Sequence, residues 1–376
     1  MSFALWLVAG LLLVSCLTQI RAIRRLDRLP AAADPGPRPR VAAIVAARDE
    51  AARLPQLAAS LLAQRGVELQ LVVVDDRSTD ATPTVLADLA AATPAVVPLR
   101  IDALPAGWLG KPHALHCGAQ QARGDWLLFC DADSTLREDV VSRAIALAER
   151  DRADHVTLTP GHVPLPFLAE ATLLAFHAAL ARHAARANAD HPRGMCGVGA
   201  FNLVRATAYR ACRGHEPLRL EVIDDVKLGL LVRRTGGRTR VCLGAGDLHS
   251  TWGSSPGDLV HVLEKNFFAA FGFSTRIGVP VALLLAAVWL LGLVGPCTGT
   301  AAGVAAGLAL HAHALPAAWL AARQGWRKAP ALAAPLGMGI LAWALLRSVA
   351  LALVRGAIVW RGTRYPLALL RRGVVR

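Results

Sequence analysis

The stretch GDWLLFCDADST, residues 124–135, decides how this sequence is interpreted. Its mostly apolar residues 126–130 run directly into Asp131, Ala132 and Asp133. An apolar run of this length is typical of a buried strand. Aspartate is common where strands end because it favours turns, so an isolated Asp-x-Asp says little. The pair becomes informative only if other polar residues gather at the same place in the fold.

The sequence around this stretch alternates predicted strands and helices with short connections. We predict strands at 41–47, 69–76, 96–101 and 125–131, and helices at 50–64, 82–91 and 111–122. The strands are continuous runs rich in Val, Leu and Ile, which indicates a parallel sheet covered on both faces. The predicted fold class is therefore α/β with a mostly parallel sheet.

Ligands of such sheets bind beyond the carboxyl ends of the strands, and four polar clusters fall there. The clusters are Arg48-Asp49-Glu50, the stretch DDRSTD at 75–80, Lys111, and Asp131 with Asp133. Each has a structural alternative; Ser78 and Asp80, for instance, are residue types that cap a following helix. Convergence of all four on one edge of a sheet favours a functional site.

The chemistry of these residues suits a nucleoside diphosphate. Two carboxylates such as Asp131 and Asp133 can share Mg²⁺ or Mn²⁺, and a substrate phosphate then completes the shell of the ion. Asp75 or Asp76 can accept a hydrogen bond from a nucleobase or a ribose hydroxyl. The predicted domain contains no G-x-G-x-x-G and no G-K-[ST] motif, which disfavours a dinucleotide-binding dehydrogenase or a P-loop ATPase.

A further carboxylate pair stands in EVIDDVKLGLLVRRTGGR, residues 221–238. The spacing predicts a helix that begins at Asp224 and stops at Gly236 and Gly237. Asp224 and Asp225 would lie at its amino end, where the helix dipole favours anions. They are either a plain capping pair or a general base aimed at an acceptor hydroxyl.

Long apolar runs indicate a membrane protein. Residues 3–20 carry no charge and are followed by RAIRRLDR, which favours a span over a signal peptide and places residue 21 onward in the cytoplasm. Residues 277–322 contain no Lys, Arg, Asp or Glu, enough for two spans with a turn at 295–300. A third run, 329–360, either crosses fully or lies in the interface. Its basic tail favours the cytoplasmic side.

The expected organisation follows from these runs. It comprises an anchor (1–22), a basic and Pro-rich linker (23–40), a cytoplasmic catalytic domain (41–250), an interfacial helix region (251–276), two or three C-terminal transmembrane helices (277–360) and a basic tail (361–376). Two shorter apolar stretches, 163–181 and 259–273, are either interfacial helices or core helices.

The bulk composition narrows the classes of partner. The net charge is +14 and the pI about 10.6, but much of the excess flanks the apolar runs, where Arg meets anionic headgroups. We therefore expect membrane lipids and no nucleic acid as partners. The seven cysteines are scattered without zinc-ligand spacing, which suits a reducing compartment.

Three stretches together resemble family 2 glycosyltransferases, which have the GT-A fold: DDRSTDAT (75–82), GKPHALHCGAQQARGDWLLFCDADS (110–134) and IDDVKLGLLVRRTGG (223–237). Three more are similar to the bacterial membrane-bound branch that includes carotenoid (diaponeurosporenoate-type) and hopanoid-associated glycosyltransferases. These are GWLGKPHAL (107–115), GHEPLRLEVIDDVKLG (214–229) and VWRGTRYPL (359–367). The resemblance covers about 40–275 and the tail.

The resemblance implies an inverting transfer of one sugar from a nucleotide-diphosphate donor, and it assigns roles residue by residue. Asp76 would contact the nucleoside, Glu50 and Lys111 would lie by the donor, Asp131 and Asp133 would form the metal and diphosphate motif, and Asp225 would be the base, with Asp224 replacing the usual Glu. No Q-x-x-R-W follows, which argues against a processive polysaccharide synthase and leaves the acceptor side unassigned. Trp252 is a candidate acceptor platform or a packing residue.

Three functions are therefore open. The leading hypothesis is a multi-pass inner-membrane enzyme that glycosylates a lipid or apolar acceptor through a hydroxyl or carboxyl group. The second is a polyprenyl-phosphate sugar transferase with the same donor site. The third is a non-catalytic membrane scaffold with a degenerate domain of the same fold.

Overall fold

The computed structural model describes residues 2–31, 38–161, 164–192 and 194–375, and its centre is a seven-stranded sheet. The strand order is β3-β2-β1-β4-β7-β6-β8. The strands are β1 (Arg40–Ala47), β2 (Glu68–Asp76), β3 (Val96–Ile101), β4 (Trp126–Asp131), β6 (His155–Thr159), β7 (Asn202–Arg205) and β8 (Thr239–Leu243). Only β7 runs antiparallel to its neighbours, so the predicted mostly parallel α/β sheet is confirmed.

Helices cover both faces of the sheet, as the continuous apolar strands predict. They are α2 (Leu54–Leu62), α3 (Thr82–Ala92), α4 (Gly110–Gln121), α5 (Val140–Asp151), α7 (Ala206–Ala211) and α8 (Asp224–Arg234). In β1, Val41 and Val45 face the core shared with α2, α3 and α5, whereas Ile44 faces α4, α7 and α8. The predicted helix 50–64 begins later, at Leu54, because Asp49 has a positive φ of 56° and residues 50–53 form a turn.

The register of the sheet aligns the ends of its central strands. Strand β1 pairs in parallel with both β2 and β4, so that Ala47 lies opposite Asp75 and Ala46 lies opposite Asp131. Side chains that follow these three strands therefore meet at one edge. A small antiparallel ribbon at the same edge joins β5 (Ser134–Leu136) to β9 (Leu248–Ser250) and brings Ser250 opposite Ser134.

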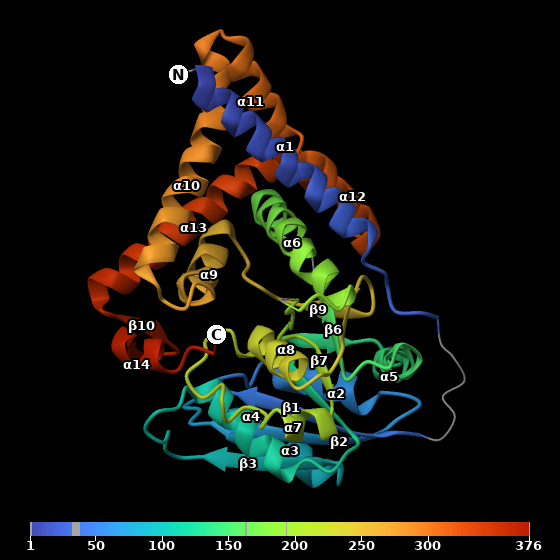
Figure 1. The fold of residues 1–376 in the computed structure, drawn as a ribbon. Helices are drawn as coiled ribbons and strands as arrows, with labels where there is room; N and C mark the ends of the chain where they lie inside the picture. Colours follow the sequence, from blue (N-terminus) through green and yellow to red (C-terminus); the bar gives the residue numbers. More distant parts are fainter. Residues whose placement is uncertain (1, 32–37, 162–163, 193, 376) are drawn as a thin grey trace.

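Long apolar helices pack together on one side of the sheet (Figure 1). They are α1 (Ser2–Arg24), α10 (Thr275–Val294), α11 (Ala301–His311), α12 (Ala314–Gln324) and α13 (Ala334–Arg355). Within the described part of the chain, four helical segments are long and apolar enough to cross a membrane: Ser2–Arg24, Thr275–Thr298, Ala301–Gln324 and Ala329–Arg355. The predicted turn at 295–300 contains a short 3₁₀ helix, η1 (Gly295–Thr298). Six residues of the predicted linker 23–40, residues 32–37, lie outside the described residues.

Two further helices lie between this bundle and the sheet, α6 (Phe167–Asn188) and α9 (Pro256–Ala270) (Figure 1). Helix α9 explains the two arginines that interrupt the third apolar run. Glu264 of α9 accepts from Arg347 Nε at 3.2 Å and from Arg355 Nη1 at 2.8 Å, and both arginines belong to α13. The charges in the apolar run therefore hold one helix against another.

The chain after α13 returns to the sheet. Helix α13 ends at Arg355, five residues before the predicted end of the apolar run, and residues beyond it form a hairpin of β10 (Ala357–Trp360) and β11 (Thr363–Pro366), followed by α14 (Leu367–Arg372). At the hairpin tip Arg361 donates to the Glu50 carboxylate at 2.5 Å and to the Arg48 carbonyl at 3.2 Å. The basic tail thus lies on the same side of the bundle as the sheet.

Packing of α4 against the sheet gives a first testable prediction. A Cβ at Gly118 of α4 would come within 2.5 Å of Ile44 Cγ2 and 3.0 Å of Val74 Cγ2, and both side chains are fully buried. We expect Gly118→Val to lower the free energy of unfolding by about 1–3 kcal/mol, as overpacking does. Thermal unfolding in detergent measures the change. Gly246→Val is the control, because a Cβ added at Gly246 would have no atom within 4 Å. Equal melting temperatures for the two variants would contradict this packing.

Candidate active site

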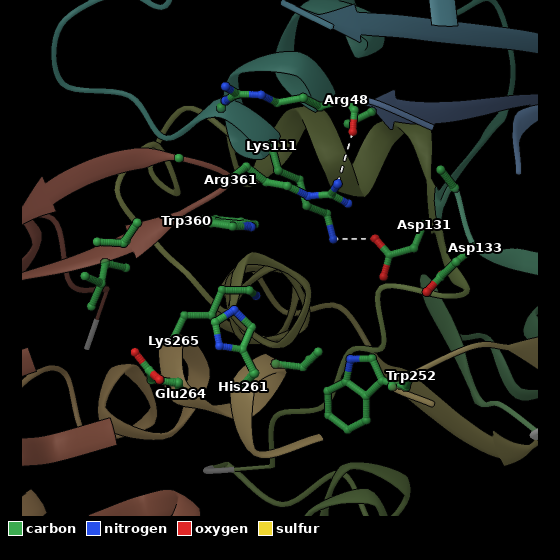
Figure 2. A pocket seen from close by; sticks show the side chains of 18 of the residues that line it. Arg48, Lys111, Asp131, Asp133, Trp252, His261, Glu264, Lys265, Trp360 and Arg361 are labelled. Atoms are coloured by element: carbon green, nitrogen blue, oxygen red, sulfur yellow. Dashed lines mark hydrogen bonds and ion pairs between the residues drawn. The ribbon is translucent and has the colours of Figure 1, made fainter. Parts of the chain in front are cut away.

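A cavity of about 920 Å³ opens at the carboxyl edge of the sheet (Figure 2). One side is built by the ends of β1, β2 and β4 and the start of α4, and the other by α9, the end of α13 and the β10–β11 hairpin. The charged residues that line it are Arg48, Glu50, Arg53, Asp76, Lys111, Asp131, Asp133, Asp258, Glu264, Lys265, Arg355 and Arg361. All four predicted polar clusters therefore contribute at least one side chain to one cavity.

Asp131 and Lys111 form the ion pair at the centre of the site. Lys111 Nζ donates to Asp131 Oδ1 at 2.6 Å, and the Asp131 N–H donates to the Gly199 carbonyl at 2.8 Å. Burial alone lowers the pKa of Lys111, but the carboxylates of Asp131, Asp224 and Asp225 outweigh it and raise the pKa above its ordinary value. Lys111 is therefore a permanent cation in the cavity.

Asp133 lies next to this pair and is the more buried carboxyl group. Ser250 Oγ, brought in by the β5–β9 ribbon, donates to Asp133 Oδ1 at 3.3 Å. Burial and the neighbouring Asp131 charge raise the pKa of Asp133 to about 7. A bound cation would relieve this repulsion, and two carboxylates are hard oxygen ligands of the kind that Mg²⁺ and Mn²⁺ prefer. Among the described residues no group of three or more His, Cys, Asp or Glu is placed to hold a metal ion, so a divalent ion would need further ligands from a substrate.

Of the two aspartates that end β2, Asp76 lines the cavity and Asp75 does not. Asp75 is buried, accepts from the Ser78 N–H at 3.0 Å and pairs with Arg100. Asp76 is held from one side by Arg77, whose Nε and Nη2 lie 2.7 and 3.0 Å from its two oxygens. A Cβ at Gly110 would overlap Asp76 Oδ2, so glycine at the start of α4 permits the close approach.

Of the remaining predicted polar residues, some line the cavity and others only hold neighbouring backbone in place. Glu50 lines the cavity and accepts from Arg53 at 3.2 Å as well as from Arg361. Ser78 and Asp80 do not line it; Ser78 Oγ accepts from the Asp49 N–H at 2.9 Å, and Asp80 Oδ1 accepts from the Thr82 N–H at 2.9 Å. Ser78 therefore supports the loop after β1 and does not cap α3, whereas Asp80 accepts from the first residue of α3 and also from the Ala51 N–H.

Asp224 and Asp225 begin α8, as the sequence predicts, but they are not among the residues that line the cavity. Asp225 Oδ2 accepts from the Gly199 N–H and Oδ1 from the Val226 N–H, both at 2.8 Å. The carbonyl of the same Gly199 accepts from the Asp131 N–H. Gly199 therefore connects the Asp225 carboxylate to the backbone of Asp131 through two hydrogen bonds. Burial raises the pKa of both carboxyl groups, that of Asp224 to about 7.

Several cavity residues received no role in the sequence analysis, among them His261, Lys265, Trp360 and Arg361 (Figure 2). Lys265 Nζ lies 4.4 Å from the ring centroid of Trp360 and donates to Asn266 Oδ1 at 2.9 Å. Burial and the Lys111 charge lower the pKa of Lys265 to about 8. The signal in the sequence was, for Lys265, a charged residue inside an apolar stretch and, for Trp360 and Arg361, their place in VWRGTRYPL, a stretch of the resemblance to which no role was assigned. Trp252, the candidate platform, lines the cavity and also packs on Phe176 with ring centroids 5.2 Å apart.

The fold and part of the sequence match known proteins. Residues 42–212 match the family described as "Glycosyl transferase family 2", so this segment is a family 2 glycosyltransferase domain. A solved mannosyltransferase from Pyrobaculum calidifontis, bound to GDP-Man and Mn²⁺, covers 93% of this chain and 99% of its own at 20% identity and a TM-score of 0.57. That likeness shows a shared fold, the GT-A fold.

Sequence relatives are similar over a shorter stretch. "Succinoglycan biosynthesis protein ExoO" of Rhizobium meliloti is 36% identical over 111 residues, which is 30% of each chain. A "4,4'-diaponeurosporenoate glycosyltransferase" of Staphylococcus haemolyticus is 31% identical over 125 residues, 33% of this chain and 32% of its own. A "Beta-monoglucosyldiacylglycerol synthase" of Nostoc is 32% identical over 123 residues, 32% of this chain and 26% of its own. The chain thus spans about a third or less of the length of these relatives.

The contact between α9 and α13 gives a second prediction. Glu264 is 14% exposed, and its loss would leave Arg347 and Arg355 without their carboxylate. We expect Glu264→Ala to lower the free energy of unfolding by about 1–3 kcal/mol. Glu216→Ala is the matched control, since the exposed Arg213–Glu216 pair contributes only about 0–1 kcal/mol. Thermal unfolding in detergent compares the two; a larger loss in the control would show that Glu264 does not hold α9 to α13.

Proposed function

We propose that this protein is an inverting membrane glycosyltransferase that moves one sugar from a nucleotide-diphosphate donor to a lipid or other apolar acceptor. The observation that carries the proposal is the meeting of Asp76, Lys111, Asp131 and Asp133 in one cavity that α9 and α13 extend towards the apolar helices. The domain match and the shared fold support it.

The donor would lie along the carboxyl edge of the sheet. Asp76, oriented by Arg77, is suited to accept a hydrogen bond from the nucleoside, and Glu50 lies beside it. Asp131 and Asp133 would hold Mg²⁺ or Mn²⁺, which when bound neutralises negative charge on a leaving diphosphate. Lys111 provides a second, permanent positive charge next to Asp131.

Asp225 is the proposed general base, with Asp224 beside it. An inverting transfer needs one carboxylate that takes the proton of the attacking hydroxyl while the sugar–diphosphate bond breaks. The Gly199 and Val226 N–H groups hold the Asp225 carboxylate in place, and a raised pKa brings it closer to that of an efficient base at neutral pH. An acceptor carboxyl group, already ionised, would need no base.

The acceptor would enter from the membrane side. The wall opposite the sheet consists of α9, the end of α13 and Trp252, next to helices with exposed leucines such as Leu284 and Leu353. Two relatives carry names that refer to a carotenoid acid and a glucosyl diacylglycerol, which supports an apolar acceptor here. By this proposal the chain is a multi-pass inner-membrane protein with residues 41–250 as its cytoplasmic catalytic domain.

The donor site is tested by calorimetry in detergent with UDP, GDP and their sugars. We expect binding with Mn²⁺ or Mg²⁺ and little with EDTA. Asp133→Asn should weaken metal-dependent binding by roughly 10-fold or more, because it removes one charged ligand. Asp88→Asn, on the exposed face of α3, is the control. Absence of binding under every condition in wild-type protein would favour the scaffold hypothesis.

The base is tested by turnover. We expect Asp225→Asn to lower kcat on the order of 10²- to 10⁴-fold with unchanged donor affinity, the range typical of a lost general base. Asp88→Asn again serves as the control, measured with the same donor and an extract of apolar lipids as acceptor. Full activity of Asp225→Asn would instead favour a phosphate acceptor such as a polyprenyl phosphate, which needs no base.

A further inference from the structure

The wall of the cavity opposite Asp131 and Asp133 is basic. Figure 2 shows Lys265 and Arg361 across the cavity from the two aspartates, whereas Lys111 reaches over to Asp131. Lys111 comes from α4, but Lys265 comes from α9 and Arg361 from the β10–β11 hairpin. The last two lie outside residues 42–212, the segment that matches the family.

Lys265 and Arg361 keep N–H donors that no group of the protein accepts from within the described residues. Among the described residues no carboxylate lies within ion-pair distance of Lys265, whose ammonium donates to Asn266 Oδ1 and faces the Trp360 ring. Arg361 donates from Nη2 to the Glu50 carboxylate and from Nη1 to the Arg48 carbonyl. The guanidinium has five N–H donors, so further donors remain for a ligand. Arg48 Nε, also at the cavity, is buried without a partner. The cavity therefore holds positive charge and donors in excess on this wall.

The conformation of Arg361 is a second, independent observation. Trp360 pairs with Thr363, so Arg361 and Gly362 form a two-residue hairpin loop with φ values of 49° and 74°. Loops of this kind favour Asn, Asp or Gly at the first position, because a side chain with positive φ is strained. Arg361 occupies this strained position, and its guanidinium points into the cavity (Figure 2).

The hairpin is fastened to the donor edge of the sheet. Arg361 contacts Glu50 and the Arg48 carbonyl, and Arg48 Nη1 donates to Thr363 Oγ1 at 3.5 Å. All three contacts join the hairpin tip to the loop after β1. The tip therefore lies across the edge at which the donor would bind, with Tyr365 lining the same cavity.

We propose that Arg361 and Lys265 bind the diphosphate of the nucleotide sugar from the side opposite Asp131 and Asp133, so that the C-terminal segment completes the donor site. This inference rests on the proposed function, because it takes the anion to be the donor diphosphate. Arginine and lysine at fixed positions form strong charge-assisted hydrogen bonds to phosphate oxygens. The transferase domain alone would then hold only half of the donor site.

The test compares nucleoside diphosphates with monophosphates in the full-length protein, by calorimetry in detergent with Mn²⁺. The probes are UDP, UMP, GDP and GMP. We expect Arg361→Gln and Lys265→Gln each to weaken diphosphate binding by roughly 10-fold or more and to leave monophosphate binding unchanged. Arg361→Lys should retain part of the affinity, since it keeps the charge but loses the planar donor pair.

Two variants control for the position of the hairpin. Arg364→Gln removes an exposed arginine of the same hairpin that donates only to the Arg355 carbonyl, and Thr363→Val removes the contact with Arg48. Both should bind diphosphates as the wild type does. If they lose as much affinity as Arg361→Gln, or if monophosphates and diphosphates weaken equally, Arg361 acts by placing the hairpin and the inference is wrong.

The remaining outcomes separate this inference from the proposed function. Wild-type affinity in both Arg361→Gln and Lys265→Gln overturns the inference and leaves the proposed function intact. A raised acceptor KM with unchanged diphosphate affinity assigns the basic wall to an anionic acceptor and likewise overturns it. Failure of the wild type to bind any of the four nucleotides removes the proposed function, and this inference with it.

Discussion

The parallel pairing of β1 with both β2 and β4 is the constraint on which the site depends. It places the carboxyl ends of three strands at one level, with Ala47 opposite Asp75 and Ala46 opposite Asp131. Residues separated by more than fifty positions in the chain thereby share one cavity. Pairing slipped by one residue would turn Asp76 and Asp131 to the other face of the sheet, because side chains alternate along a strand.

The second half of the chain closes the cavity that the sheet opens. Glu264 joins α9 to α13 through two arginines, and the hairpin after α13 returns to Glu50 and the loop after β1. The apolar helices and the site are therefore mechanically connected. In the proposed function, this wall, built from the segments that flank the apolar helices, would bring an apolar acceptor within reach of a charged donor.

Much of the fold follows from local pattern. Strands β1 to β4 and helices α3, α4 and α8 lie within a residue or two of the predicted bounds, because buried apolar runs and helix termini are local signals. Strands β6, β7 and β8 were not predicted; β7 has only four residues and gains its partners from distant strands. The predicted helix at 50–64 began early because the turn after Asp49 depends on bonds to residues 78–80.

The sequence by itself determined the α/β sheet, the apolar helices and most of the carboxylates and the lysine at the sheet edge, since each rests on residue type and spacing. The resemblance already pointed to Asp76, but only the tertiary structure showed that Asp75 is buried away from the cavity, that Ser78 and Asp80 hold neighbouring backbone, and that Lys265 and Arg361 line the cavity. The physical reason is distance along the chain. Arg361 meets Glu50 across 311 residues, and no local pattern encodes a contact that exists only once both segments pack on the same sheet.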